Sequence, residues 1–163
     1  MRRFTIILAI LAVAAIGPAA ALGKPHGTDR PVKGTSTSTT TVDLATGTGT
    51  SDGTGHISHL GAFTFHNDHS GFTVTGDTFS WTQTATIVAA NGDEIFTTAV
   101  GTGTLLPNNT SEATLVSTIT GGTGRFADAS GTLTSSISSV TVSAVGTTIT
   151  SEDTETHTGR ISY

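Results

Sequence analysis

The sequence predicts an all-β domain, and three observations carry that prediction. Thr is abundant, 20 of the 163 residues are Gly, and helix-forming residues are scarce after the first 23 positions. β-Branched Thr suits a half-buried pleated surface, and Gly supplies turns and bulges. Apolar and polar residues also alternate along several segments that are separated by short turn motifs. These features favour a sandwich or a barrel without distinguishing the two.

The first 23 residues have the pattern of a secretory signal peptide. A basic start precedes an apolar run over residues 4–16, and small residues follow a Gly-Pro pair. The run is too short to span a bilayer, and the ending predicts cleavage after Ala21 or Gly23. An uncleaved anchor is the alternative, although the Gly-Pro pair argues against it. We expect a secreted, periplasmic or cell-envelope protein with no integral membrane span after cleavage.

The remaining chain divides into an extended lead-in over residues 24–33 and one β domain over residues 34–163. The formal net charge is −5, and removal of the signal takes two Arg residues with it. An acidic chain repels phosphate backbones and anionic lipids, so nucleic acid is not an expected partner. The absence of Cys excludes disulfides and thiol nucleophiles. No cofactor is expected, and the sequence gives no oligomeric state.

The strand before Asn91-Gly92 has the clearest pattern, with Phe79, Trp81 and Gln83 alternating with hydroxyl residues. We predict that this apolar face is the interior. Asn-Gly favours a two-residue hairpin loop, and that register places Phe96, together with Thr98 and Val100, on the Trp81 face. The other expected strands cover residues 35–44, 55–66, 72–75, 111–120, 131–142 and 147–162.

The strand over residues 55–66 alternates Ile57, His59, Phe63 and Phe65 with polar residues. The aromatic face is expected to be interior, and His59 shares it. An interior His can act as an acid, a base or a ligand anchor. The simpler interpretation is a core His that is hydrogen-bonded to a backbone carbonyl or to Gln83.

Four motifs together resemble bacterial proteins with an allene oxide cyclase barrel-like domain, which are related in fold to plant dirigent proteins. They are ITGGTGRFADASGTLT at residues 119–134, His59-Leu60-Gly61, ATIVAANGDEIF at residues 85–96, and the ending GRISY. The resemblance implies an eight-stranded antiparallel β-barrel. The plant relatives steer the cyclisation or coupling of apolar intermediates, but their catalytic side chains have no residue-by-residue match here. A β-solenoid built on the Gly-Thr repeats is the alternative, and it lacks a fixed period.

A small eight-stranded barrel is either filled by side chains or holds one small ligand. The expected ligand-lining residues are Phe63, Phe79, Trp81, Gln83 and Phe96.

On the last strand, Glu155 and His157 share the parity of Ile161, so they face inward unless a bulge intervenes. A bulge at Gly159 would return both to solvent, and we favour that interpretation because burying an unpaired charge is costly.

The motif His66-x-x-His69, with Asp68 between, holds donors that suit Zn²⁺ or Ni²⁺. The simpler interpretation is a polar loop over residues 67–71.

The sequence therefore predicts an exported, threonine-rich β-barrel of non-catalytic character. We expect a binding or envelope-associated module that holds a small apolar ligand. The enzymatic alternative is an isomerase or cyclase that uses His59 with Glu155 or His157 inside the cavity. The second alternative is weak divalent-metal binding through His66 and His69.

Overall fold

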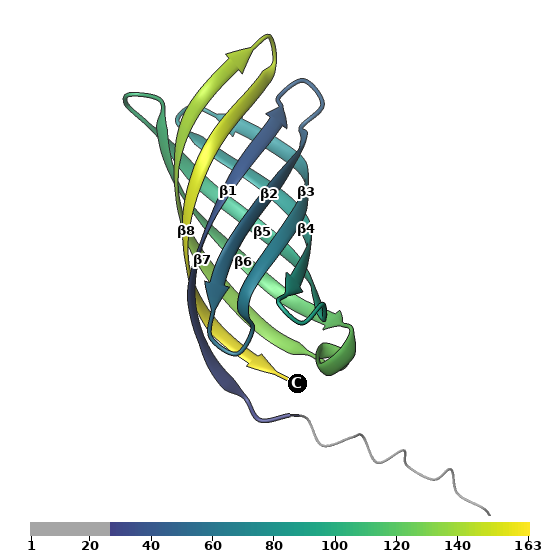
Figure 1. The fold of residues 1–163 in the computed structure, drawn as a ribbon. Coiled ribbons are helices and arrows are strands. Elements are labelled where there is room, and N and C mark those ends of the chain that lie inside the picture. The colour runs from purple at the N-terminus through teal and green to yellow at the C-terminus, as the bar shows by residue number, and fades with distance from the viewer. Residues whose placement is uncertain (1–26) are drawn as a thin grey trace, which may run out of the picture.

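The computed structural model describes residues 27–163, which form a closed barrel of eight antiparallel strands in sequential order (Figure 1). The prediction of an eight-stranded antiparallel barrel is therefore confirmed. The predicted signal peptide lies outside the described residues. The strands are β1 (Arg30–Asp43), β2 (Thr48–Ile57), β3 (Gly61–Thr75), β4 (Thr78–Ala89), β5 (Glu94–Leu106), β6 (Thr110–Gly122), β7 (Ser130–Val145) and β8 (Thr148–Ser162).

Pairing between the first and last strands closes the barrel. The β1–β8 register runs without interruption from Arg30↔Ile161 to Asp43↔Thr148. Every strand thus has two hydrogen-bonded neighbours, so no sheet edge is left open. β1 begins within the segment that the sequence predicts as a lead-in.

The two ends of the barrel differ. One end, here called the closed end, carries the β2–β3 and β4–β5 turns, the C-terminus and the 3₁₀ helix η1 (Gly124–Phe126), as Figure 1 shows. The other, the open end, carries the remaining four hairpin turns. At the closed end Phe126 is 0% exposed and packs edge-to-face on Tyr163, with ring centroids 4.9 Å apart.

The Gly-Gly-Thr-Gly-Arg-Phe turn is fixed to the neighbouring hairpin. The backbone N–H of Arg125 donates to Asp93 Oδ2 at 3.2 Å, and the backbone N–H of Glu94 donates to Thr123 Oγ1 at 2.9 Å. Gly124 has φ +53, and a Cβ there would lie 1.9 Å from Asp93 Oδ1. Only glycine meets both conditions, so the motif shapes the closed end.

The β4–β5 hairpin corrects one prediction. The register pairs Val88 with Glu94, and the N–H of Ala89 donates to the carbonyl of Asp93, so the loop has three residues. The extra residue inverts the parity of β5 relative to the prediction. Phe96 and Val100 consequently face outward, with 37% and 58% exposure, and so does Thr98. Trp81 faces inward as predicted and is 6% exposed.

Two further predictions about strands near β3 are wrong. Residues 55–66 do not form one strand, because the chain turns tightly between Ile57 and Gly61, with His59 at φ +72. Residues 67–71 are not a loop, because β3 continues through them to Thr75. A bulge between Ser70 and Thr73, where Gly71 has φ +62, then turns Phe72 inward.

Aromatic rings inside the barrel lie over glycines on the paired strand. Trp81 and Phe79 pair with Gly101 and Gly103, and a Cβ on these glycines would lie 2.2 Å and 2.3 Å from the respective rings. Phe63 and Phe65 on β3 cover Gly55 and Gly53 in the same way. In the Gly-Thr repeat at residues 101–104, the glycines thus face inward beneath a ring and the threonines face outward.

Candidate functional site

The barrel interior contains two cavities, one above the other. The lower cavity, toward the closed end, has a volume of about 60 Å³, and the upper cavity has a volume of about 280 Å³. The upper cavity reaches the open end, where its lining residue Leu105 is 46% exposed. Four side chains line both cavities and separate them: Asn67, Gln83, Leu115 and Glu155.

One wall of the upper cavity is aromatic and belongs to β3 and β4. The rings of Phe72 and Phe79 stack with centroids 5.5 Å apart, and Phe79 stacks on Trp81 at 5.7 Å. The indole N–H of Trp81 donates to Gln83 Oε1 at 2.9 Å, so the buried donor is satisfied. This wall offers the faces of flat, apolar rings to a ligand.

The opposite wall is acidic and rich in hydroxyls. Asp153 and Glu155 lie on β8, four strands from β4 in a ring of eight, so they face the aromatic wall across the barrel. Asp153 accepts hydrogen bonds from Thr40 at 2.5 Å and from Ser151 at 2.9 Å. The hydroxyl of Ser38 lies 3.4 Å from both Asp153 Oδ2 and Glu155 Oε1 and links the two carboxyl groups.

A hydrogen-bonded chain connects this wall to β3. His69 Nε2 lies 2.6 Å from Ser51 Oγ, and Ser51 Oγ lies 2.6 Å from Thr40 Oγ1. Because the single proton of Thr40 goes to Asp153, Ser51 must donate to Thr40 and accept from His69. The chain therefore selects the Nε2–H tautomer of His69. Burial lowers the pKa of His69, although the negative charge of Asp153 opposes this.

Glu155 is the group whose acidity the interior changes most clearly. It is 7% exposed, and burial together with the negative charge of Asp153 raises its pKa to about 7. The Ser38 hydrogen bond acts in the opposite direction and is too weak to compensate. A carboxyl group with this pKa can both donate and accept a proton near neutrality.

His157 belongs to the lower cavity. Its Nε2 lies 2.8 Å from Ser36 Oγ, and its Nδ1 lies 2.7 Å from Ser135 Oγ. Burial lowers its pKa, so the neutral ring is favoured. Pairing of β8 with both neighbours is continuous through Gly159, so no bulge intervenes. The prediction that Glu155 and His157 face solvent is therefore wrong, and both line the interior.

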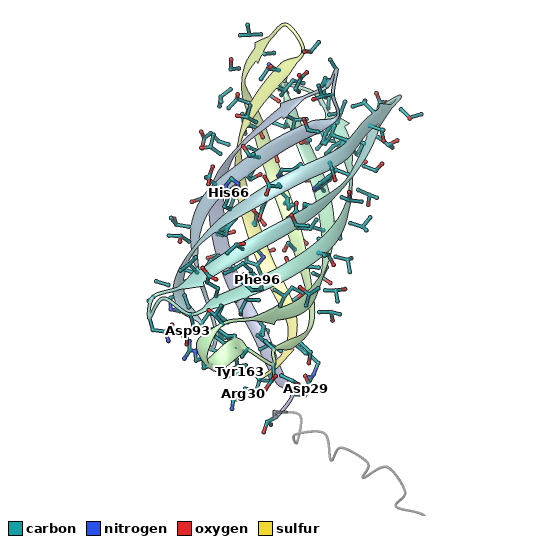
Figure 2. The ribbon with its side chains drawn as sticks, turned by 90° about the vertical axis from the view of Figure 1, so that its right-hand side faces the viewer. Asp29, Arg30, His66, Asp93, Phe96 and Tyr163 are labelled. Atoms are coloured by element: carbon teal, nitrogen blue, oxygen red, sulfur yellow. The ribbon has the colours of Figure 1, made fainter. Side chains whose placement is uncertain are left out.

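The structure separates the residues that the sequence proposed as a site. Phe79, Trp81 and Gln83 line the upper cavity, Phe63 lines the lower one, and Phe96 lies on the outer surface (Figure 2). His59 is exposed in its turn, and its Nε2 lies 3.1 Å from the carbonyl oxygen of Pro31. It therefore contributes to neither cavity.

The two histidines proposed for metal binding lie on opposite faces of β3. His66 is on the outside, 2.7 Å from Asp52 Oδ1, and this hydrogen bond raises its pKa. His69 points inward to Ser51. A pair of imidazoles on opposite sides of a sheet cannot share an ion, so the His66-His69 metal site is wrong. Within residues 27–163, no cluster of three or more His, Asp or Glu side chains could hold a metal ion.

Sequence reasoning did not single out Thr40, Ser51 or Asp153 as site residues. Their connection depends on β1 lying between β8 and β2. Asp153 lies an even number of residues before Ile161 on the last strand, so alternation predicts that both face inward. The sequence offers no other indication of this site.

Comparison with known proteins gives no assignment: no protein-family model matches the chain, and neither does any curated protein or solved structure. In the part of the chain that the structure describes, no helix is long and apolar enough to cross a membrane.

Proposed function

We propose that this chain is an exported barrel of the allene oxide cyclase barrel-like type that binds a small, largely apolar ligand in the upper cavity. The pattern of residues 1–23 supports export to the cell envelope or beyond. The closed eight-stranded barrel and the Gly-Gly-Thr-Gly-Arg-Phe turn support the family.

One observation carries the binding function: a cavity of about 280 Å³ reaches the open end and has an aromatic wall facing a polar one. Binding sites for small molecules are typically concave and mostly apolar, with a few polar groups that orient the ligand. The stacked rings of Phe72, Phe79 and Trp81 supply the apolar surface. Asp153, Glu155 and their hydroxyl partners supply the orienting groups.

Trp81 is the only tryptophan of the chain and lines the cavity, so its fluorescence reports occupancy directly. We expect the neutral fluorophore N-phenyl-1-naphthylamine to quench Trp81 saturably with one site per barrel. Phe79→Ala should weaken this binding about fivefold, equivalent to about 1 kcal/mol.

Phe96→Ala is the matched control, because it removes the same ring from the outer face of the barrel. It should leave the affinity unchanged. Quenching that does not saturate, or equal losses in the two variants, would refute binding in the upper cavity.

A second candidate function is proton-transfer catalysis, as in an isomerase or cyclase. The pKa of Glu155, raised to about 7 inside a cavity, favours it. We expect the protein to accelerate deuterium exchange at the α-carbon of cyclohexanone in D₂O, measured by NMR, and Glu155→Gln to abolish the acceleration. Equal exchange rates with the two proteins would exclude this role for Glu155.

A further inference from the structure

The basic side chains of the described residues gather at the closed end. They are Arg30, Lys33, Arg125 and Arg160, and three of them are already engaged there. Arg30 donates to the Tyr163 hydroxyl at 2.8 Å, Arg125 lies 3.8 Å from Asp93, and Arg160 pairs with Asp29. Figure 2 shows Arg30, Tyr163 and Asp93 together at this end.

Among residues 27–163, the open end carries acidic groups without basic ones. Asp43 ends β1, Asp77 occupies the β3–β4 turn, and Glu112 lies near the start of β6. The sequence has no Lys or Arg between residues 34 and 124 or between 126 and 159. The open end of the barrel, toward which the upper cavity opens, therefore carries net negative charge, which attracts cations and repels anions.

The two cavities are likewise lined by carboxyl groups without any Lys or Arg side chain. The titratable groups that line the two cavities are Asp153 and Glu155 on β8, His69 on β3 and His157 on β8. Burial disfavours the charged form of both histidines. The two carboxyl groups thus have no basic side chain among the lining residues to neutralise them, and hydroxyl groups alone satisfy Asp153. Burying charge without a counter-ion is costly, so a bound cation would stabilise the ionised form of these carboxyl groups.

The aromatic wall of the upper cavity also favours a cationic ligand. Ring faces carry negative electrostatic potential and attract ammonium groups placed over them. The rings of Phe79 and Trp81 lie flat over glycines of β5, and with Phe72 they form a continuous aromatic surface that lines the same cavity as the carboxyl groups. An apolar body can therefore lie on the rings while its cationic group reaches Asp153 and Glu155.

We propose that the upper cavity selects small organic cations, in which an ammonium group is attached to an apolar body, over neutral and anionic molecules of the same size. This inference rests on the binding function proposed above and adds the charge of the ligand. Because Glu155 must ionise to contribute fully, cation binding should strengthen as pH rises through about 7 and should release a proton.

Three probes of nearly equal size test the selectivity: 2-phenylethylamine, 2-phenylethanol and 3-phenylpropionate. Their affinities are measured by calorimetry and by Trp81 fluorescence at about pH 8. We expect the amine to bind at least about tenfold more tightly than the alcohol, and the carboxylate most weakly. The affinity of the amine, whose charge is constant over this range, should fall several-fold between about pH 8 and about pH 5.5.

Glu155→Gln and Asp153→Asn should each reduce the preference for the amine over the alcohol. Glu152→Gln is the matched control, because Glu152 lies on the same strand but faces outward, where it accepts a hydrogen bond from Thr39. That variant should keep the preference.

Equal binding of amine and alcohol would overturn the selectivity while leaving the proposed binding function intact. Tightest binding of the carboxylate, or an equal effect of Glu152→Gln and Glu155→Gln, would also overturn it. Saturable binding by none of the three probes and by no neutral fluorophore would remove both proposals together.

Discussion

The two ends of this barrel are built from the same strands, but they differ in how much apolar side chain is buried between those strands. Toward the closed end the buried apolar cluster consists mostly of Val, Ile, Leu and Phe, and Phe126, Ile95 and Ile161 are almost completely removed from solvent. Toward the open end the buried apolar residues are few: Trp81, Ala99 and Leu115 form one cluster, and Val42 is buried beside the upper cavity. The aromatic neighbours Phe72 and Phe79 are half-buried. Stability is thus concentrated in one half, which leaves the other half room for a cavity.

Above the apolar cluster, the interior holds a polar layer made of Asp153, Glu155, His69 and His157 with their hydroxyl partners. Buried carboxyl and imidazole groups need partners, and β1, β2 and β7 supply Ser and Thr at inward positions next to them. Within residues 27–163, no buried side-chain nitrogen or oxygen lacks a hydrogen bond. The polar layer is therefore compatible with a closed barrel, although it costs more to bury than the apolar layer below it.

The strongest test of this comparison is Phe126→Ala. Removing a fully buried ring from the closed end should lower the free energy of unfolding by about 3–5 kcal/mol. Phe79→Ala, at the half-buried open end, should cost less than about half of that. Both are measured by urea denaturation followed by Trp81 fluorescence. An equal or larger loss for Phe79→Ala would show that the open half carries comparable stability.

Glu155→Gln tests the cost of the polar layer. A carboxyl group with a raised pKa keeps its proton in the folded state between its ordinary value of 4.5 and about 7, whereas the unfolded chain loses it. Stability therefore falls as pH rises through this window, by up to about 3 kcal/mol. The variant should be more stable than the original chain by about that amount near pH 8 and equal to it near pH 4.5.

The lowered pKa values of His69 and His157 affect stability in the opposite direction to Glu155. The unfolded chain takes up protons on these histidines before the folded one does, so stability falls as pH drops below about 6.5. The original chain and the Glu155→Gln variant should both show this loss at low pH. A pH profile of unfolding that is identical with Glu and Gln at position 155 would contradict the assigned burial of the charge.

The smallest expected effect is that of Gly101→Ala, which adds a methyl group beneath Trp81. The new Cβ would lie 2.2 Å from Trp81 Cζ2, so the indole must shift toward the cavity. We expect a loss of about 1–3 kcal/mol and a change in Trp81 emission. Thr102→Val, on the outward face next to it, should stay within about 0.5 kcal/mol. Unaltered emission in Gly101→Ala would mean that the ring does not rest on this glycine.

Alternation within one strand was predictable, and loops of unknown length were not. Phe79, Trp81 and Gln83 share a face because side chains alternate along β4. The predicted inward orientation of Phe96 is wrong because it depends on whether the hairpin loop has two residues or three. The sequence leaves the orientation of Glu155 and His157 open because Gly159 permits a bulge, and only the pairing of β8 with β1 and β7 shows that none occurs there.

The sequence by itself determined the all-β class, the inward face of β4 and the residue types that line a barrel, because these follow from local alternation and composition. The resemblance of its turn motifs added the number of strands. Only the tertiary structure brought Asp153, Thr40, Ser51 and His69 into one hydrogen-bonded chain, since they come from β8, β1, β2 and β3. Asp153 and Thr40 are 113 positions apart, and their contact depends on closure of the barrel in a single register. A shift of that register by one residue would turn every partner to the other face, which is why local pattern alone could not place them.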